Sequence, residues 1–512
     1  MLSFKRLKQS KAARNTAAAY FAFFSMAASG FLSIPVAVRF LDKEEIGLWA
    51  AINAMISYLL WMDLGIGNAI GRKMADAIVA KDQEEIDNWW TLTQVTLWIL
   101  GAGMVIIGLL CTPVFIAIFK VPPQLKSDAW LLLGVTSAIA GINFPLRAVP
   151  GLLTAQERFH WVSICQGTMP WLQFGGFYFM VSRGHGLSSY LWGTAASQFF
   201  VFVFYKVLVL HSEQRPRWSR AGFDRERFRS LFSFSLSMSV AGLKESLLQS
   251  LPTMILARHG GLASVPIYTF TARAPQIVAS LVRRTSNAFY PSLINLYVAR
   301  EKEEFLAKHR FTGMLTLTIA TIAASGVLLF NQFFVELIAG RDYYAGPYAN
   351  IGFAVSIIIV SMSTLHSCLL HVSGKMKKTS MVSILSLIGS YVAAILALQY
   401  LGMAGLAAVF AIEPMIYGIY GFTQGAKTME YKISEFSLST LIYACLSCLL
   451  MAASGIAMNF VPSGTLVIHL WSRSATVPGP YQFAIAILIA MIASAIGIQS
   501  MRKPNKTKQS NR

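Results

Sequence analysis

The chain has 512 residues, of which 55% are hydrophobic and only 13% charged, and its mean hydropathy is +0.55. Soluble domains carry about a quarter charged residues, so the composition excludes an ordinary soluble protein and predicts a multi-span membrane protein. The formal net charge of +20 is explained more simply by basic loops that orient a membrane protein than by nucleic-acid binding, so no nucleic-acid partner is expected.

Apolar runs long enough to cross a bilayer recur along the whole chain. A spanning helix needs roughly 20 mostly apolar residues, and about fourteen such runs are separated by charged or Pro/Gly-rich breaks. The basic start, residues 1–15, leads into the first run without a small-residue cleavage site, so we expect a retained helix and not a signal peptide. The predicted fold class is an all-α polytopic membrane protein. The expected spans are 17–38, 46–70, 92–119, 129–153, 160–182, 188–210, 232–257, 262–282, 311–339, 349–371, 381–400, 404–424, 436–460 and 481–501.

Lysine and arginine are distributed unevenly over the connecting loops. With an even number of spans and both termini in the cytoplasm, most of the 43 basic residues fall on the cytoplasmic side. This asymmetry is what the positive-inside rule requires, so it predicts that both termini are cytoplasmic. All five cysteines fall within expected spans, where packing explains them better than a redox or metal site.

An internal repeat organises the chain. The sequence IVAKDQEEI at 78–86 reappears 219 residues later as YVAREKEEF at 297–305, and the same offset pairs Arg39 with Arg258. Self-similarity at a fixed period indicates a duplicated architecture, and six spans between the copies return the second in the same orientation. We therefore expect two parallel six-helix lobes, 1–210 and 231–425, a basic cytoplasmic linker at 211–230, and two extra helices with a basic tail at 426–512.

Three stretches resemble a known family. They are RFLDKEEIGLWAAINAMISYLLWMDLGIGNAIGRKMADAIVAKD (39–82), FYPSLINLYVAREKEEFLAKHR (289–310) and SGKMKKTSMVSILSLIGSYVAAILALQYLGMAGLAA (373–408). These resemble the Wzx-type polysaccharide flippases, the lipid-linked oligosaccharide translocases of the multidrug/oligosaccharidyl-lipid/polysaccharide (MOP) superfamily. Where that family often carries Asn in the eleventh helix, this chain has Ser390, which weakens any polar contact expected there.

The resemblance implies a transporter and not an enzyme. The expected substrate is an undecaprenyl-diphosphate-linked oligosaccharide, an O-antigen or exopolysaccharide repeat, moved from the cytoplasmic to the outer leaflet of the bacterial inner membrane. The two lobes would alternate access to a site near the midplane. No cofactor is expected beyond a coupling Na+ or H+. The expected partners are the lipid-linked substrate, the bilayer and glycan synthesis or polymerase proteins, with the chain itself a monomer.

Six ionisable residues lie inside expected spans, where such groups are costly and functional by default. Three are cations suited to a diphosphate, because Arg offers bidentate hydrogen bonds and Lys a point charge. The acids would titrate or bind the coupling cation. The diphosphate-binding candidates are Arg273, Arg147 and Lys244, with Arg283 and Arg284 at the cytoplasmic mouth, and the ion-coupling candidates are Glu245, Glu413 and Asp63.

The alternative is that these charges pair among themselves to lock helices together, for instance Lys244 or Arg273 with Glu245 or Glu413. At the repeat offset, only Arg147 meets a basic residue, His366, whereas Asp63 meets Val282. The charges are therefore not needed to build the fold. Adjacent helical residues point about 100° apart, so Glu245 borders a polar stripe while Lys244 points away, with Glu413 as its first-choice acid.

Aromatic residues are plentiful, and sugars stack on their faces. Most tryptophans sit at expected span boundaries, as interfacial anchors do. Trp171 and Trp61 lie deeper and are weak candidates for stacking on the sugar.

Two other functions remain open. A membrane-embedded glycan polymerase or ligase would act on the same lipid-linked sugars, but the longest expected outer loop, 462–481, has one His, one Arg and no acid for acid/base chemistry. No GxxxxGK[ST] phosphate loop occurs either. A major-facilitator exporter also has two parallel six-helix halves, although GIGNAIGRKM (65–74) lacks the Asp-Arg pairing associated with that family.

Overall fold

The computed structural model describes residues 11–63, 65–219, 224–372, 376–428, 433–461, 467–470 and 473–502. They form two compact units, Met1–Val265 and Pro266–Arg512, and each unit is described by itself. Every expected span overlaps one or more helices, and nine helices of the described chain are long and apolar enough to cross a membrane. The all-α polytopic fold predicted from the hydropathy is confirmed.

The first unit consists of helices and short helical turns. Helix α2 packs against α8, α8 against α9 and α5 against α6, while α10 packs against α3 and α4. Its elements are α2 (Lys11–Phe40), α3 (Lys43–Leu60), η1 (Trp61–Asp63), α4 (Ile66–Val79), α5 (Gln83–Ile118), η2 (Pro123–Leu125), α6 (Lys126–Ile142), η3 (Phe144–Ala148), α7 (Val149–Ala155), α8 (Phe159–Val181), η4 (Gly186–Ser188), α9 (Ser189–Leu210), α10 (Arg225–Ile255) and η6 (Leu256–Gly260).

Two expected spans of the first unit are interrupted. The span at 46–70 is divided into α3 and α4, with Gly65 in the left-handed conformation at φ 73°. The span at 129–153 is divided into α6 and α7, and Pro145 at the start of η3 cannot donate a helical hydrogen bond. The two interrupted spans pack so closely that a Cβ on Gly67 would collide with the carbonyl oxygen of Arg147.

The second unit contains the remaining helices and one hairpin. Helix α14 joins two helices across a kink at Gly402, φ 61°, which lies between the expected spans 381–400 and 404–424. Strands β1 and β2 pair antiparallel, with Val467 opposite Thr476. The elements are α11 (Ser264–Val298), α12 (Lys302–Ile338), η7 (Arg341–Tyr343), α13 (Pro347–Val372), α14 (Met376–Thr428), α15 (Ile433–Asn459), β1 (Val467–Leu470), β2 (Arg473–Thr476) and α16 (Pro480–Arg502).

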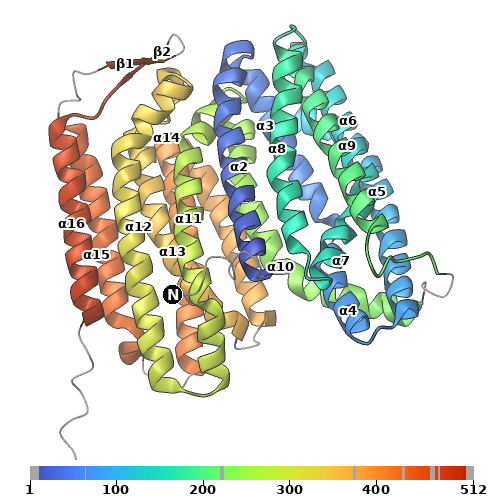
Figure 1. Cartoon of the computed structure of the whole chain (residues 1–512). Coiled ribbons are helices and arrows are strands. Elements are labelled where there is room, and N and C mark those ends of the chain that lie inside the picture. Colours follow the sequence, from blue (N-terminus) through green and yellow to red (C-terminus); the bar gives the residue numbers. More distant parts are fainter. Residues whose placement is uncertain are drawn as a thin grey trace, which may run out of the picture. The chain divides into compact units, whose positions relative to one another are not determined.

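The two helices that have no counterpart in the repeat are part of the core of the second unit. Helices α15 and α16, orange to red in Figure 1, pack against α12. The apolar core combines Leu317 of α12, Ile357 of α13, Met451 of α15 and Ile489 of α16. The hairpin, in what was expected to be a plain loop, is fixed to the end of α12 by Arg473, which donates to the carbonyl oxygen of Ile338.

The lobe boundaries derived from the repeat stay a prediction. By internal contacts the first compact unit extends to Val265 and includes α10, which the repeat assigns to the second lobe. The contacts of α10 with α3 and α4 account for this grouping.

Candidate functional site

An ion pair joins the two interrupted spans of the first unit. Arg147 Nε donates to Asp63 Oδ2 at 2.7 Å, and Asp63 Oδ1 accepts from the backbone N–H of Gly65 at 2.9 Å. The Asp63 side chain is 5% exposed, whereas that of Arg147 is 35% exposed. The short turns η1 and η3 carry the two charges, so both helix breaks lie at this pair.

The guanidinium of Arg147 is only partly engaged. Within the described residues its hydrogen bonding is limited to the Nε contact with Asp63, while the ring of Phe144 lies 5.3 Å from its central carbon. Its terminal nitrogens are therefore left to bind an external acceptor. The carboxylate holds Nε, and the aromatic ring supports the plane of the guanidinium. Together they fix the orientation of the two terminal nitrogens to which a phosphate group would bind.

The corresponding helices of the second unit have a different arrangement. At the repeat offset Asp63 and Arg147 correspond to Val282 and His366, and the helices that carry them, α11 and α13, are not interrupted there. His366 is buried, its Nδ1 donates to the Met362 carbonyl at 2.9 Å, and its ring centroid lies 5.6 Å from that of His309. The Asp63–Arg147 pair with its double break is thus a feature of the first unit.

Arg273 stands half-buried in the middle of α11. Among the described residues its side chain has no hydrogen bond or ion pair. Four residues after Thr271, Pro275 lacks the N–H that would bond the Thr271 carbonyl, and the side chain of Asn331 in α12 donates to that oxygen at 2.9 Å instead. Asn331 also donates to Asn350 Oδ1 at 2.8 Å, which ties α11, α12 and α13 together two residues before Arg273.

The other basic candidates, Arg283, Arg284 and Lys244, are half-buried and make interactions of their own. Arg283 and Arg284 lie three turns beyond Arg273 on α11, and Arg283 Nη2 donates to Ser280 Oγ at 3.4 Å. Lys244 is half-buried in α10 and makes interactions of its own. Glu245 falls on the same helix, but its side chain lies outside the described residues.

Glu413 is the buried acid of the second unit. It is 2% exposed in α14, and its Oε1 accepts from Ser386 Oγ at 2.9 Å. Ser390, one turn along the same helix from Ser386, is 6% exposed. Within the described part of the chain, no group of three or more His, Cys, Asp or Glu side chains is placed to hold a metal ion.

The two tryptophan candidates lie in the first unit. Trp61 is the first residue of η1, two residues before Asp63, and is half-buried. Trp171 of α8 is 39% exposed and makes an edge contact with Phe174 at 6.4 Å. Trp61 is thus close in sequence to the ion pair, while Trp171 belongs to another helix.

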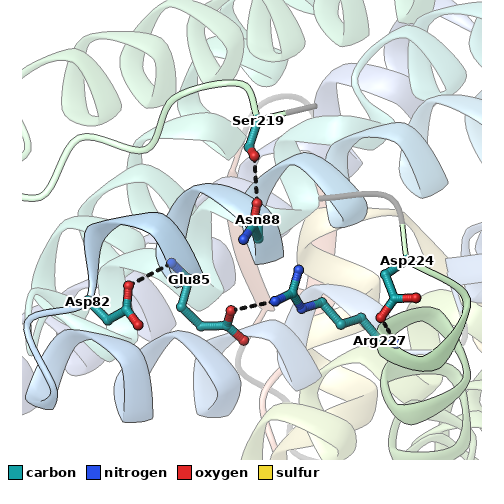
Figure 2. A network of polar contacts seen from close by, with 6 residues as sticks. All are labelled: Asp82, Glu85, Asn88, Ser219, Asp224 and Arg227. Carbon is teal, nitrogen blue, oxygen red and sulfur yellow. Dashed lines mark hydrogen bonds and ion pairs between the residues drawn. The ribbon is translucent and has the colours of Figure 1, made fainter. Parts of the chain in front are cut away.

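A polar network also holds the segment between α9 and α10 against the start of α5, and we call this network the linker clamp (Figure 2). Glu85 pairs with Arg227 of α10 at 2.9 Å, and Asn88 accepts from the hydroxyl of Ser219. Asp82 caps α5 by accepting from the N–H of Glu85. The remaining contacts join Arg217 N to Asp87 at 2.8 Å, Ser219 N to Thr91 at 2.9 Å and Gln83 to the Arg215 carbonyl at 3.2 Å.

Sequence reasoning identified Asp63 and Arg147 separately but missed their pairing. Both lie at the same expected depth, about two-thirds of the way toward the cytoplasm, in the second and fourth expected spans, which was the signal available. The pairing of Lys244 with Glu413 stays a prediction. The linker clamp was also missed, because its acids Asp82 and Glu85 were interpreted only as part of the internal repeat.

Comparisons with known proteins find one family model and several solved structures that are similar to this chain. A family model described as "Polysaccharide biosynthesis protein" matches residues 36–346. An inward-facing MATE-family multidrug resistance transporter of the MOP superfamily is similar in structure, with a TM-score of 0.65 and 16% identity over 82% of this chain and 98% of its own. The lipid II flippase MurJ, in an inward closed conformation, has a TM-score of 0.67 and 13% identity over 95% of this chain and 99% of its own.

A search of curated protein sequences finds no significant match. At such low identity the structural likenesses establish the fold alone, which this chain shares with the MATE transporter and with MurJ. The family model, by contrast, covers well over half of the sequence and includes two of the three stretches that carry the resemblance. The chain belongs to the polysaccharide biosynthesis protein family.

Proposed function

We propose that this protein is a flippase that moves undecaprenyl-diphosphate-linked oligosaccharide units, an O-antigen or exopolysaccharide repeat, across the bacterial inner membrane. The family match and the fold shared with MurJ and MATE proteins support a transporter of lipid-linked sugars. The single observation that carries the proposal to the diphosphate is Arg147, whose Nε is held by Asp63 while its side chain stays 35% exposed.

The chemistry of Arg147 suits a diphosphate. A guanidinium whose Nε is occupied by a buried carboxylate keeps two terminal nitrogens for a second, external anion. Such a fork binds two phosphate oxygens in parallel, which a lysine cannot do. Asp63 then has a positioning role that the proposal adds to its expected role in ion coupling.

Arg273 supports the same proposal in the second unit. An arginine within a spanning segment is costly, and this one has no protein acceptor among the described residues. A bound phosphate group would supply that acceptor. Lys244, Arg283 and Arg284 would add positive charge along the path of the headgroup, with Trp61 and Trp171 available to stack on the sugar.

Ion coupling is the finer part of the proposal. Glu413 is buried and accepts a hydrogen bond from Ser386, so protonation or cation binding there would change the hydrogen bonding of α14. Na+ and H+ are both compatible with a buried carboxylate that accepts from a hydroxyl. A polymerase or ligase is a weaker alternative, since the sequence of the expected outer loop, 462–481, contains no acid for catalysis.

The proposal is tested by deleting the gene and identifying the lipid-linked sugar that accumulates in the cytoplasmic leaflet. The deletion strain is then complemented with Arg147→Gln, Arg273→Gln or Lys244→Gln, with protein level measured for each. We expect the arginine variants to abolish export after normalisation to protein level, which Arg147→Gln should lower because it removes the guanidinium partner of the buried Asp63 carboxylate. Arg183→Gln, at an exposed arginine that contacts the Phe179 ring, serves as the charge-matched control and should export normally. Unaltered export in all three variants would refute the proposed diphosphate site.

A further inference from the structure

The linker clamp holds the backbone on both sides of Trp218. Arg217 is fixed through its N–H on Asp87 and its carbonyl on Thr91, and Ser219 through its N–H on Thr91 and its hydroxyl on Asn88. Figure 2 shows the Ser219–Asn88 contact beside the Glu85–Arg227 ion pair. Trp218 lies between these anchored neighbours, so its backbone has little freedom.

The clamped segment presents an exposed aromatic ring among arginines. Trp218 is 65% exposed, although a tryptophan of a folded protein normally buries most of its surface. Arg215, Arg217, Arg225 and Arg229 are exposed as well, and within the described residues no acid pairs with their side chains. The acids of α5 bind the backbone of the segment and Arg227, so in the described part of the chain they form no ion pair with the other four arginines.

The segment lies at a membrane surface. A candidate span ends at Leu210, directly before it, and another begins at Gln83, the residue that bonds the Arg215 carbonyl. Tryptophan is enriched at the level of the lipid headgroups, and basic clusters there attract anionic lipids. Orienting a membrane protein requires only the charges and does not require a rigid backbone, so orientation alone leaves the clamp unexplained.

We infer that the described residues 215–219 and 224–229 form a binding surface for anionic phospholipid headgroups, in which the arginines contact the phosphates and Trp218 lies in the interface. The charge is complementary, and guanidinium groups bind phosphate oxygens in pairs. The clamp fixes the backbone that carries Arg215, Arg217 and Trp218, which lowers the entropy lost on binding. This inference does not depend on what the protein transports.

The test uses the full-length protein in detergent, titrated with dioleoylphosphatidylglycerol or dioleoylphosphatidylcholine and followed by native mass spectrometry. Arg215→Gln/Arg217→Gln/Arg229→Gln removes three charges but leaves the clamp, which uses only backbone atoms of Arg215 and Arg217. The matched control, Lys120→Gln/Lys126→Gln/Arg183→Gln, removes three exposed charges, two just beyond the end of α5 and one just beyond the end of α8. At about five-fold per basic residue, affinity for phosphatidylglycerol should fall by about 100-fold in the first variant.

A second measurement locates Trp218 itself. In vesicles containing brominated phosphatidylglycerol, bromine quenches only tryptophans near the lipid, so Trp218→Phe should reduce the quenchable fluorescence relative to wild type. Three results would overturn the inference. These are equal binding of the two lipids by wild type, equal loss of affinity in the control variant, and an unchanged quenchable fraction in Trp218→Phe.

Discussion

The Asp63–Arg147 pair makes an asymmetric prediction about stability. Removing Arg147 leaves a carboxylate that is 5% exposed with the Gly65 N–H as its remaining partner, which should cost about 3–5 kcal/mol of unfolding free energy. Asp63→Asn keeps the acceptor for Gly65 and leaves an arginine that reaches solvent, so it should cost only about 1–2 kcal/mol. Arg147→Gln is therefore expected to be the more destabilising change.

The assay is a double-mutant cycle of unfolding free energies in mixed micelles, with Asp63→Asn, Arg147→Gln and the double variant. Residues in direct contact couple by about 0.5–3 kcal/mol, so the double variant should be less destabilised than the sum of the single variants. Arg147→Lys adds a functional measurement. It keeps the charge near Asp63 but loses the planar fork, so export should fall by roughly ten-fold or more while stability changes little.

Two results would refute this reasoning. If Asp63→Asn costs as much stability as Arg147→Gln, the difference in burial between the two charges does not control the energetics. If Arg147→Lys exports at the wild-type rate, the terminal nitrogens of the guanidinium do not bind the transported headgroup.

Two further predictions concern the second unit. Asn331→Ala removes the donors to the Thr271 carbonyl and Asn350, so it should lower the unfolding free energy by about 1–3 kcal/mol, and Pro275→Ala should recover part of that loss by restoring the backbone N–H. No recovery in the double variant would contradict the compensating role of Asn331. Glu413→Gln retains an acceptor for Ser386, so thermal stability should hardly change while export becomes insensitive to collapse of the proton or sodium gradient. Persistent gradient dependence in that variant would exclude Glu413 as the coupling site.

The fold was predictable from hydropathy, but the interruptions within it were not. Long apolar runs identify spans regardless of small deviations, so 46–70 and 129–153 were each expected as one helix. The interruptions depend on local chemistry, the left-handed Gly65 after Asp63 and the proline at 145. Both signals are short, and a window of spanning length averages over them.

Side-chain partners were less predictable than elements. Depth in the membrane follows from position in a span, but pairing depends on which helices touch and on their rotation. The closeness of α4 and α7 rests on Gly67 and Gly71 facing Arg147 and Gly151, a contact that single-sequence periodicity does not specify. The hydrogen bond from Ser386 to Glu413 likewise depends on how the two halves of α14 fold together at Gly402, which the sequence alone does not specify.

The different surroundings of Arg147 and Arg273 suggest different contributions to binding. Asp63 neutralises part of the charge of the Arg147 guanidinium, so the electrostatic attraction of Arg147 for an anion is weaker. Asp63 also holds the guanidinium in one orientation. An anion at Arg273 would meet a half-buried cation without an acid in the described chain, where both desolvation and charge favour a tight contact. In the export test, Arg273→Gln should therefore weaken substrate affinity most. Arg147→Lys, which alters geometry more than charge, should act mainly on the rate of transfer.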